Sequence, residues 1–178
     1  MSQTNNFIFN GLKIVTWIIF VGLCIEAGAL VVNFIFSLYN PEFVQKLYQK
    51  LDLSEMYTQN QWAFYSMYSF ILFIAVLKAY LFYIVIVLIT KIELSNPFNN
   101  FVSKQILQIS YYTFSIGLIS YIARQSAKNL QHYKYNIDAL NQFWADSQAF
   151  ILMSAVIYVI AIIFSKGVEN QEELDETV

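Results

Sequence analysis

Apolar residues dominate four stretches of the chain, and shorter segments rich in polar residues separate them. A bilayer core about 30 Å thick requires roughly 20 apolar residues in a helix. Four stretches meet this requirement or come close to it: residues 12–38, 62–90, 106–122 and 149–165. The pattern predicts an all-α integral membrane protein, a four-helix bundle in one domain that spans residues 1–178, with both chain ends on the same side.

The third stretch is the most polar of the four. Six hydroxyl side chains interrupt it: Ser110, Tyr111, Tyr112, Thr113, Ser115 and Ser120. Hydroxyl groups inside a membrane helix are commonly satisfied by neighbouring helices. We therefore expect this span to be the one most enclosed by the other three.

Short helices at the membrane surface are predicted in the first connection. Asn40-Pro41-Glu42 is typical of a helix start, because Pro suits the first helical position and Glu complements the helix dipole. Apolar residues then recur at helical spacing: Val44, Leu47, Tyr48 and Leu51. This spacing predicts an amphipathic helix that lies along the membrane.

The other two connections differ in length. Ser95-Asn96-Pro97-Phe98 predicts a tight turn with a helix start at Pro97, so the second and third spans form a hairpin. The third connection covers about residues 125–148 and places Ile137, Leu140 and Trp144 on one helical stripe. Aromatic residues favour the membrane interface, which predicts an interfacial segment there.

The low content of charged residues argues against a soluble domain and against a protein that binds nucleic acid. Charged residues make up 12% of the chain, against roughly 25% in a soluble domain, and the net charge is −2. Five acids lie in or beside a tail over residues 167–178, and the remaining body is too mildly basic to indicate a nucleic-acid partner. Lys and Arg are nearly balanced between the two sides, so counting them does not decide the orientation.

No pattern of catalytic residues is present. His132 is the single histidine, and one histidine makes neither a catalytic triad nor a metal site. No metalloprotease, serine hydrolase or phosphate-binding-loop motif occurs. We therefore expect a protein that is not an enzyme, with no catalytic residue, cofactor or metal ion.

Two ionisable residues lie deep inside predicted spans, Glu26 in the first and Lys78 in the second. A charge at the centre of a membrane helix costs about 2.5–3.5 kcal/mol on the insertion scale. At about 1.5 Å per residue, both residues lie roughly 18–20 Å from the same end of their helices. Antiparallel neighbours would bring them level, so we expect them to pair.

Small and polar residues follow stripes on three of the predicted helices. The first span carries Gly22, Glu26, Ala29 and Asn33; the third carries Ser110, Thr113, Gly117, Ser120 and Arg124; the fourth carries Ser154, Tyr158, Ala161 and Ser165. Small residues let helices approach closely in a membrane. The candidate intramembrane polar site is therefore made of Glu26, Lys78, Asn33, Ser110, Thr113 and Tyr158.

Two interpretations of the Glu26 and Lys78 pair remain open. The pair can be structural and fix the register of the helices. It can also be a site for a proton, an ion or a ligand, because ionisable groups inside a membrane are functional candidates.

Three segments resemble a bacterial membrane family known as domain of unknown function 2975. They are Lys13-Ile14-Val15, the turn from Ile92 to Phe98, and the ending Gly167-Val168-Glu169 with Gln171-Glu172-Glu173 and Thr177-Val178. The resemblance covers nearly the whole chain, although Asn170, Leu174 and Glu176 stand where the family has Leu, Asn and Leu. It implies four spans in the bacterial inner membrane and cytoplasmic termini. It also implies that a helix-turn-helix regulator is encoded beside the protein.

The leading functional hypothesis is a non-enzymatic, sensory or regulatory membrane protein with a cytoplasmic partner. The candidate contacts are Asn96, Pro97, Phe98, Glu172 and Glu173. The alternative is a small transporter or channel subunit that uses the Glu26 and Lys78 pair. Four spans would need a homo-oligomer to enclose a pathway. The lipid bilayer is an expected partner under either hypothesis.

Overall fold

The computed structural model describes residues 3–39, 53–92, 97–132, 135 and 137–176. Its elements are α1 (Gln3–Tyr39), α2 (Ser54–Gln59), α3 (Gln61–Lys91), α4 (Asn100–His132), the 3₁₀ helix η3 (Asp138–Phe143) and α5 (Ser147–Glu176). Four of them, α1, α3, α4 and α5, are long and apolar enough to cross a membrane. The predicted all-α fold is confirmed, and its four long apolar helices are those of a multi-pass membrane protein.

Each long helix extends beyond its predicted span, and asparagine caps mark two of the starts. The side-chain oxygen of Asn60 accepts hydrogen bonds from Trp62 N and Ala63 N where α3 begins. The side-chain oxygen of Asn99 accepts from Val102 N at 2.9 Å. Such a cap fixes where a helix begins. The predicted helix start at Pro97 is therefore wrong, because the capping group lies two residues later.

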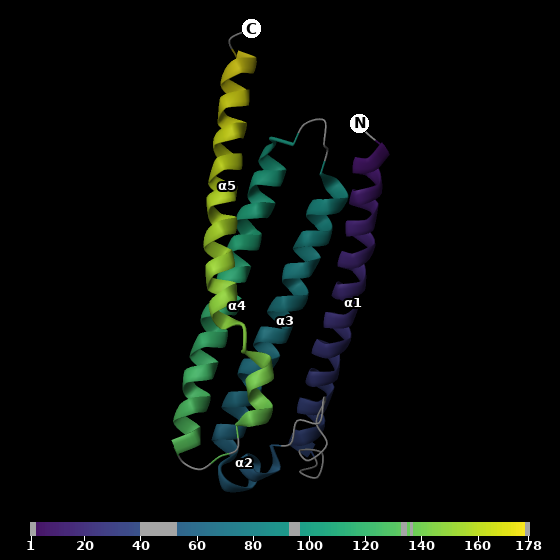
Figure 1. Ribbon diagram of the computed structural model, residues 1–178. Coiled ribbons are helices and arrows are strands. Elements are labelled where there is room, and N and C mark those ends of the chain that lie inside the picture. Colours follow the sequence, from purple (N-terminus) through teal and green to yellow (C-terminus); the bar gives the residue numbers. More distant parts are fainter. Residues whose placement is uncertain (1–2, 40–52, 93–96, 133–134, 136, 177–178) are drawn as a thin grey trace.

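The long helices lie side by side in the order in which the chain forms them. The main packing contacts join α1 with α3, α3 with α4, and α4 with α5 (Figure 1). Both α3 and α4 are flanked on two sides, and they are the two most enclosed spans, to the same extent. The prediction that the third span alone would be the most enclosed is therefore wrong.

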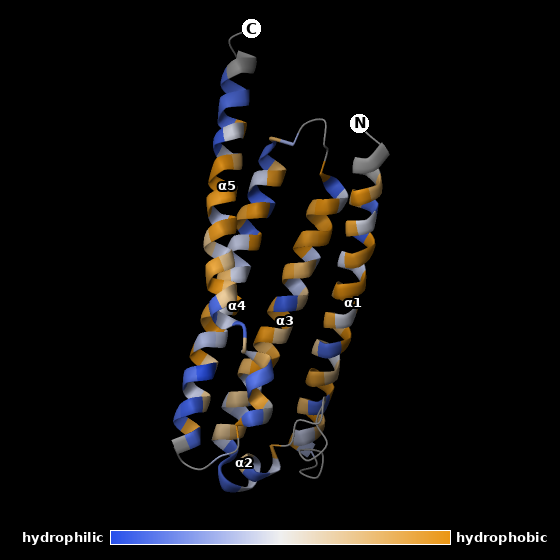
Figure 2. Ribbon diagram, in the orientation of Figure 1, coloured by the Kyte–Doolittle hydropathy of each residue, from blue (hydrophilic) through white to orange (hydrophobic). Residues whose placement is uncertain are grey.

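The two ends of this row differ. The start of α1 and the end of α5 lie at one end, whereas α2 and η3 lie at the other (Figure 1). We call these the terminal half (residues 7–20, 81–91, 100–113 and 154–176) and the η3 half (residues 27–39, 53–75, 116–132 and 137–144). In the terminal half, orange, apolar residues predominate on α1, α3 and the middle of α5, whereas α4 alternates orange with blue and the last turns of α5 are hydrophilic (Figure 2).

The η3 half contains the core of the protein. Its largest fully buried side chains are Trp144, Tyr68 and Phe64, and they belong to one continuous cluster of buried apolar residues. The ring of Phe34 stacks on that of Tyr68, with 5.1 Å between centroids. Rings from α1, α2 and α3 meet here, because Tyr57 also contacts Phe64 edge to face.

The third connection folds back into this core. Ile137, Leu140, Phe143 and Trp144 are all buried, and η3 contacts α4. The stripe of apolar residues was predicted to lie at the membrane interface, and this prediction is wrong because the stripe is covered by the long helices. The amphipathic helix predicted over residues 41–51 lies outside the residues that the structure describes.

Candidate functional site

The predicted polar stripe of the third span lies on α4 and faces α5. Ser110, Thr113 and Ser120 are all buried. The Ser110 hydroxyl donates a hydrogen bond to the Ser154 carbonyl oxygen at 3.0 Å, which joins the two helices. The Thr113 hydroxyl donates to the Ile109 carbonyl of its own helix at 2.7 Å. The Ser110 and Thr113 hydroxyls are therefore satisfied within the helix pair.

The helices α4 and α5 approach each other closely at Gly117. A Cβ atom at this position would lie 2.7 Å from Ile151 Cγ1 and 2.9 Å from the Ile151 backbone nitrogen. Backbone atoms cannot move aside as a flexible side chain can. Glycine at this position therefore sets the distance between the two helices, as small residues commonly do in membranes.

Tyr158 lies on the outer surface of this pair. Its side chain is 44% exposed, and its ring lies 6.4 Å from that of Tyr111, which is also exposed. The expectation that Tyr158 would contribute to an enclosed polar interior is therefore wrong. In a bilayer this surface faces lipid or the interfacial region.

On α1, the face that packs is different from the predicted one. Ala27, Leu30 and Ser37 are buried against the rest of the protein. The Tyr68 hydroxyl of α3 donates to the Leu30 carbonyl oxygen at 3.0 Å, in a buried position. At Gly22, in contrast, no atom lies within 4 Å of where a Cβ would be.

The predicted stripe on α1 therefore flanks the contact with α3 and does not form it. Both Glu26 and Asn33 are half-buried. Spacing along a helix gives the depth of a residue, but it does not give the rotation of the helix about its axis. As a result, the structure does not bring these two residues to the stripe on α4.

Lys78 lies near the middle of α3 and points toward α5. Its ammonium nitrogen lies 5.9 Å from the centroid of the Phe150 ring, within the range of a cation–π contact. Among the residues described, no ion pair joins it to Glu26. The predicted pairing is therefore wrong, because Lys78 is directed at the corner between η3 and α5.

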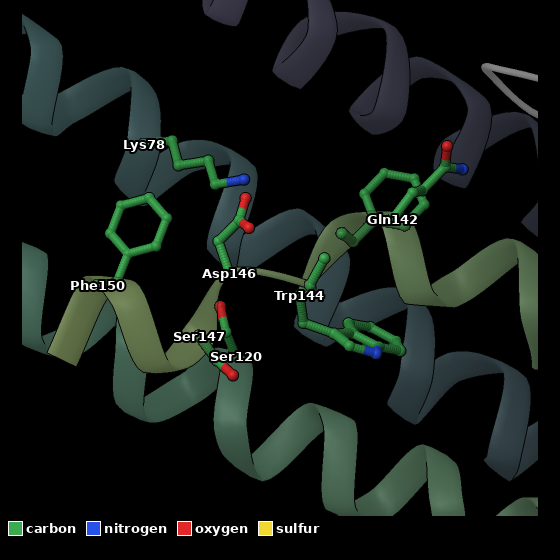
Figure 3. Close-up of a pocket in the computed structure, with 9 residues that line it drawn as sticks. Lys78, Ser120, Gln142, Trp144, Asp146, Ser147 and Phe150 are labelled. Carbon is green, nitrogen blue, oxygen red and sulfur yellow. The ribbon is translucent and has the colours of Figure 1, made fainter. Parts of the chain in front are cut away.

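A small cavity lies at this corner, and Lys78 lines it together with Ser120, Asp146 and Ser147. Figure 3 shows the side chains of Lys78 and Asp146 pointing toward one another across it. Three helices and η3 thus contribute to one polar pocket. Sequence reasoning missed Asp146 and Ser147, which directly precede the fourth predicted span.

A signal for these two residues existed in the sequence. Asp and Ser are typical of helix N-termini, so Asp146-Ser147 indicates the start of α5. Ser147 lines the same cavity as Ser120. Within the described ranges, no group of three or more His, Cys, Asp or Glu side chains could hold a metal ion. The pocket offers one cation, one carboxylate and hydroxyls, which suit hydrogen bonding and proton exchange.

The residues predicted to contact a partner differ in how they are placed in the structure. Asn96 lies outside the described residues, and Pro97 is half-buried. The ring of Phe98 packs on α5, where a Cβ on Gly167 would lie 2.6 Å from it. Glu172 accepts a hydrogen bond from the Asn100 side chain at 2.8 Å.

The acidic end of α5 is the more exposed of the two candidate contacts. Residues 169–173 are all exposed and include Glu172 and Glu173. This segment continues the helix to Glu176, so the acidic tail is helical over most of its length.

No protein-family model, no curated protein and no solved structure matches this chain.

Proposed function

We propose that the protein is a non-enzymatic membrane component of sensory or regulatory type that presents the C-terminal end of α5 to a protein partner. One observation supports this proposal above the others. The helix α5 projects past the ends of its neighbours, and its projecting turns are hydrophilic (Figures 1 and 2). Within a bilayer-spanning helix, such turns extend into the aqueous phase.

The charge of this segment favours a basic partner. Glu169 and Glu173 are exposed and lie four residues apart, on one side of the helix. Complementary charge raises association rates and favours correct partners. The segment also has a fixed direction, because Val168 is buried and Asn100 binds Glu172.

The family resemblance extends the proposal to the location and the partner. It favours the bacterial inner membrane with both termini in the cytoplasm. On this basis we propose a cytoplasmic regulator of the helix-turn-helix type as the partner of α5. This regulator, and not the membrane protein, would contact nucleic acid.

The experiment compares proteins that are cross-linked to the full chain and to its variants in native membranes. Glu169→Gln with Glu173→Gln should remove most of the partner, as should deletion of residues 167–178. The matched control is Glu55→Gln with Asp138→Asn, which changes the net charge equally at the opposite end of the helix row. Equal recovery of cross-linked proteins with and without residues 167–178 would refute the proposal.

Transport is the second candidate function, and the polar pocket at Lys78 favours it. Ionisable residues within a membrane frequently mark the route of a proton or ion. The test is the flux of protons or ions into liposomes that contain the purified protein. A loss of flux in Lys78→Met but not in Glu26→Gln would support transport through the pocket, whereas no flux with the unaltered protein would exclude this function under the conditions used.

A further inference from the structure

The pocket at the corner between η3 and α5 is small and polar. It offers about 10 Å³ to the centre of a water-sized sphere. A space of roughly 10–15 Å³ by this measure holds one water molecule, provided that two to four polar groups surround it. The size therefore restricts the occupant to a single water molecule or a species of the same size.

The charges around the pocket favour a neutral occupant. The Lys78 ammonium and the Asp146 carboxylate approach it from opposite sides (Figure 3). In the part of the chain that the structure describes, no direct ion pair joins these two groups. An anion would be repelled by Asp146 and a cation by Lys78, whereas water can accept from one group and donate to the other.

The Ser147 hydroxyl supplies an independent observation. It lines the pocket, its residue is 1% exposed, and it has no hydrogen-bond partner among the described residues. Buried hydroxyls in proteins are nearly always paired, and a water molecule is a common partner. The indole nitrogen of Trp144 is also buried and has no hydrogen-bond partner among the described residues, but it points away from Lys78 (Figure 3).

We propose that this pocket binds one water molecule, which accepts a hydrogen bond from Lys78 and donates to Asp146 and Ser147. Asp146 is exposed, so water reaches the pocket from its side. The bridge connects α3 to the first turn of α5 and to the turn that joins η3 to α5. It thereby holds the returning segment, which carries Trp144, against the long helices.

The decisive variant is Ser147→Ala, measured as the thermal midpoint of the purified protein in detergent. If water pairs with the hydroxyl, the variant loses a hydrogen bond and the midpoint falls by about 2–4 °C. If the hydroxyl is unpaired, its removal relieves an unfavourable burial and the midpoint rises. Ser110→Ala is the matched control, because that buried serine has a known partner and must lower the midpoint.

A double-mutant cycle tests the two charges. Lys78→Met and Asp146→Asn should each lower the midpoint, and the second substitution should have much less effect once the first is present. The control is Lys91→Met, because Lys91 lies 5.7 Å from the Phe101 ring centroid, a contact similar to that of Lys78, but does not line the pocket.

The outcomes are distinct. A lower midpoint for Ser147→Ala together with coupling between Lys78 and Asp146 supports the water bridge. A higher midpoint for Ser147→Ala, or strictly additive effects of the two charge substitutions, overturns it. If Lys78→Met does not fold, the sign of the Ser147→Ala effect decides alone.

Discussion

The η3 half and the terminal half are held together in different ways. With the exception of Leu81, every member of the buried apolar cluster lies in the η3 half or directly beside it, including Trp144, Tyr68 and Phe64. In the terminal half, many large apolar side chains are exposed. Small or hydroxyl-bearing residues, among them Ser110, Thr113, Ser154 and Ala161, are buried between its helices alongside Leu81, Ile84, Ile86 and Val102.

The difference lies in what fills the space between the helices. Large side chains fill it in the η3 half, where truncation of one of them leaves a cavity. Within lipid, an apolar side chain gains little by moving inside, so helices associate through close packing and hydrogen bonds. Truncation should therefore cost most in the η3 half, and enlargement should cost most where two helices pack closely, as α4 and α5 do at Gly117.

The largest effect is expected for Trp144→Ala in the η3 half. Truncation of a fully buried tryptophan typically costs about 3–5 kcal/mol of stability, because it removes buried area and leaves a cavity. Trp62→Ala is the control, since Trp62 is 83% exposed and Trp144 only 1%. Thermal unfolding measures both, and similar losses from the two variants would show that the η3 half has no core of the kind described.

Enlarging a side chain should lower stability more between α4 and α5 than on the open face of α1. Gly117→Leu places new atoms against the Ile151 backbone, and overpacking of this kind costs about 1–3 kcal/mol. Gly22→Leu makes the same chemical change where no atom lies within 4 Å, so its effect should stay within about 0.5 kcal/mol. A Gly117→Leu protein that unfolds at the same temperature as Gly22→Leu would contradict close packing here.

A smaller effect is expected for Tyr68→Phe, which keeps the ring and removes the hydrogen bond to Leu30. The net contribution of one such bond is about 0.5–1.5 kcal/mol. Tyr83→Phe removes a hydroxyl from an exposed tyrosine of the same helix and should change stability less. If both substitutions have equal effects on thermal unfolding, the bond between α1 and α3 contributes nothing.

The smallest effect is expected for Asn100→Ala at the tip of the terminal half. Its bond to Glu172 is exposed, and exposed contacts of charged groups contribute less than about 1 kcal/mol. Global stability should therefore hardly change, but amide hydrogen exchange should become faster in the last turns of α5. The control is Asn170→Ala, and equal exchange in both variants would show that Asn100 does not restrain this end.

The sequence could predict the spans but only part of the site. Length and hydropathy identify four helices because each must satisfy its own backbone within lipid. Ser110 and Thr113 were found because hydroxyls at helical spacing share a face. The pairing of Glu26 with Lys78 failed because equal depth leaves the rotation of each helix undetermined.

The returning segment shows a second limit. Ile137, Leu140 and Trp144 form the same stripe whether they rest on a membrane surface or on other helices. Their burial depends on contacts with residues far away in the chain, which periodicity does not contain. For the same reason Asp146 escaped notice, since its significance depends on Lys78, which precedes it by 68 positions.

The order of the helices has a consequence for how the chain assembles. The main contacts join successive long helices, so each span can dock on its predecessor as soon as it has been synthesised. Few contacts between helices far apart in the chain have to form. The returning segment follows α3 and α4 in the chain, so both helices can be in place when Trp144 is buried. Folding is therefore expected to be vectorial, with the docking of α5 on α4 as its closing step.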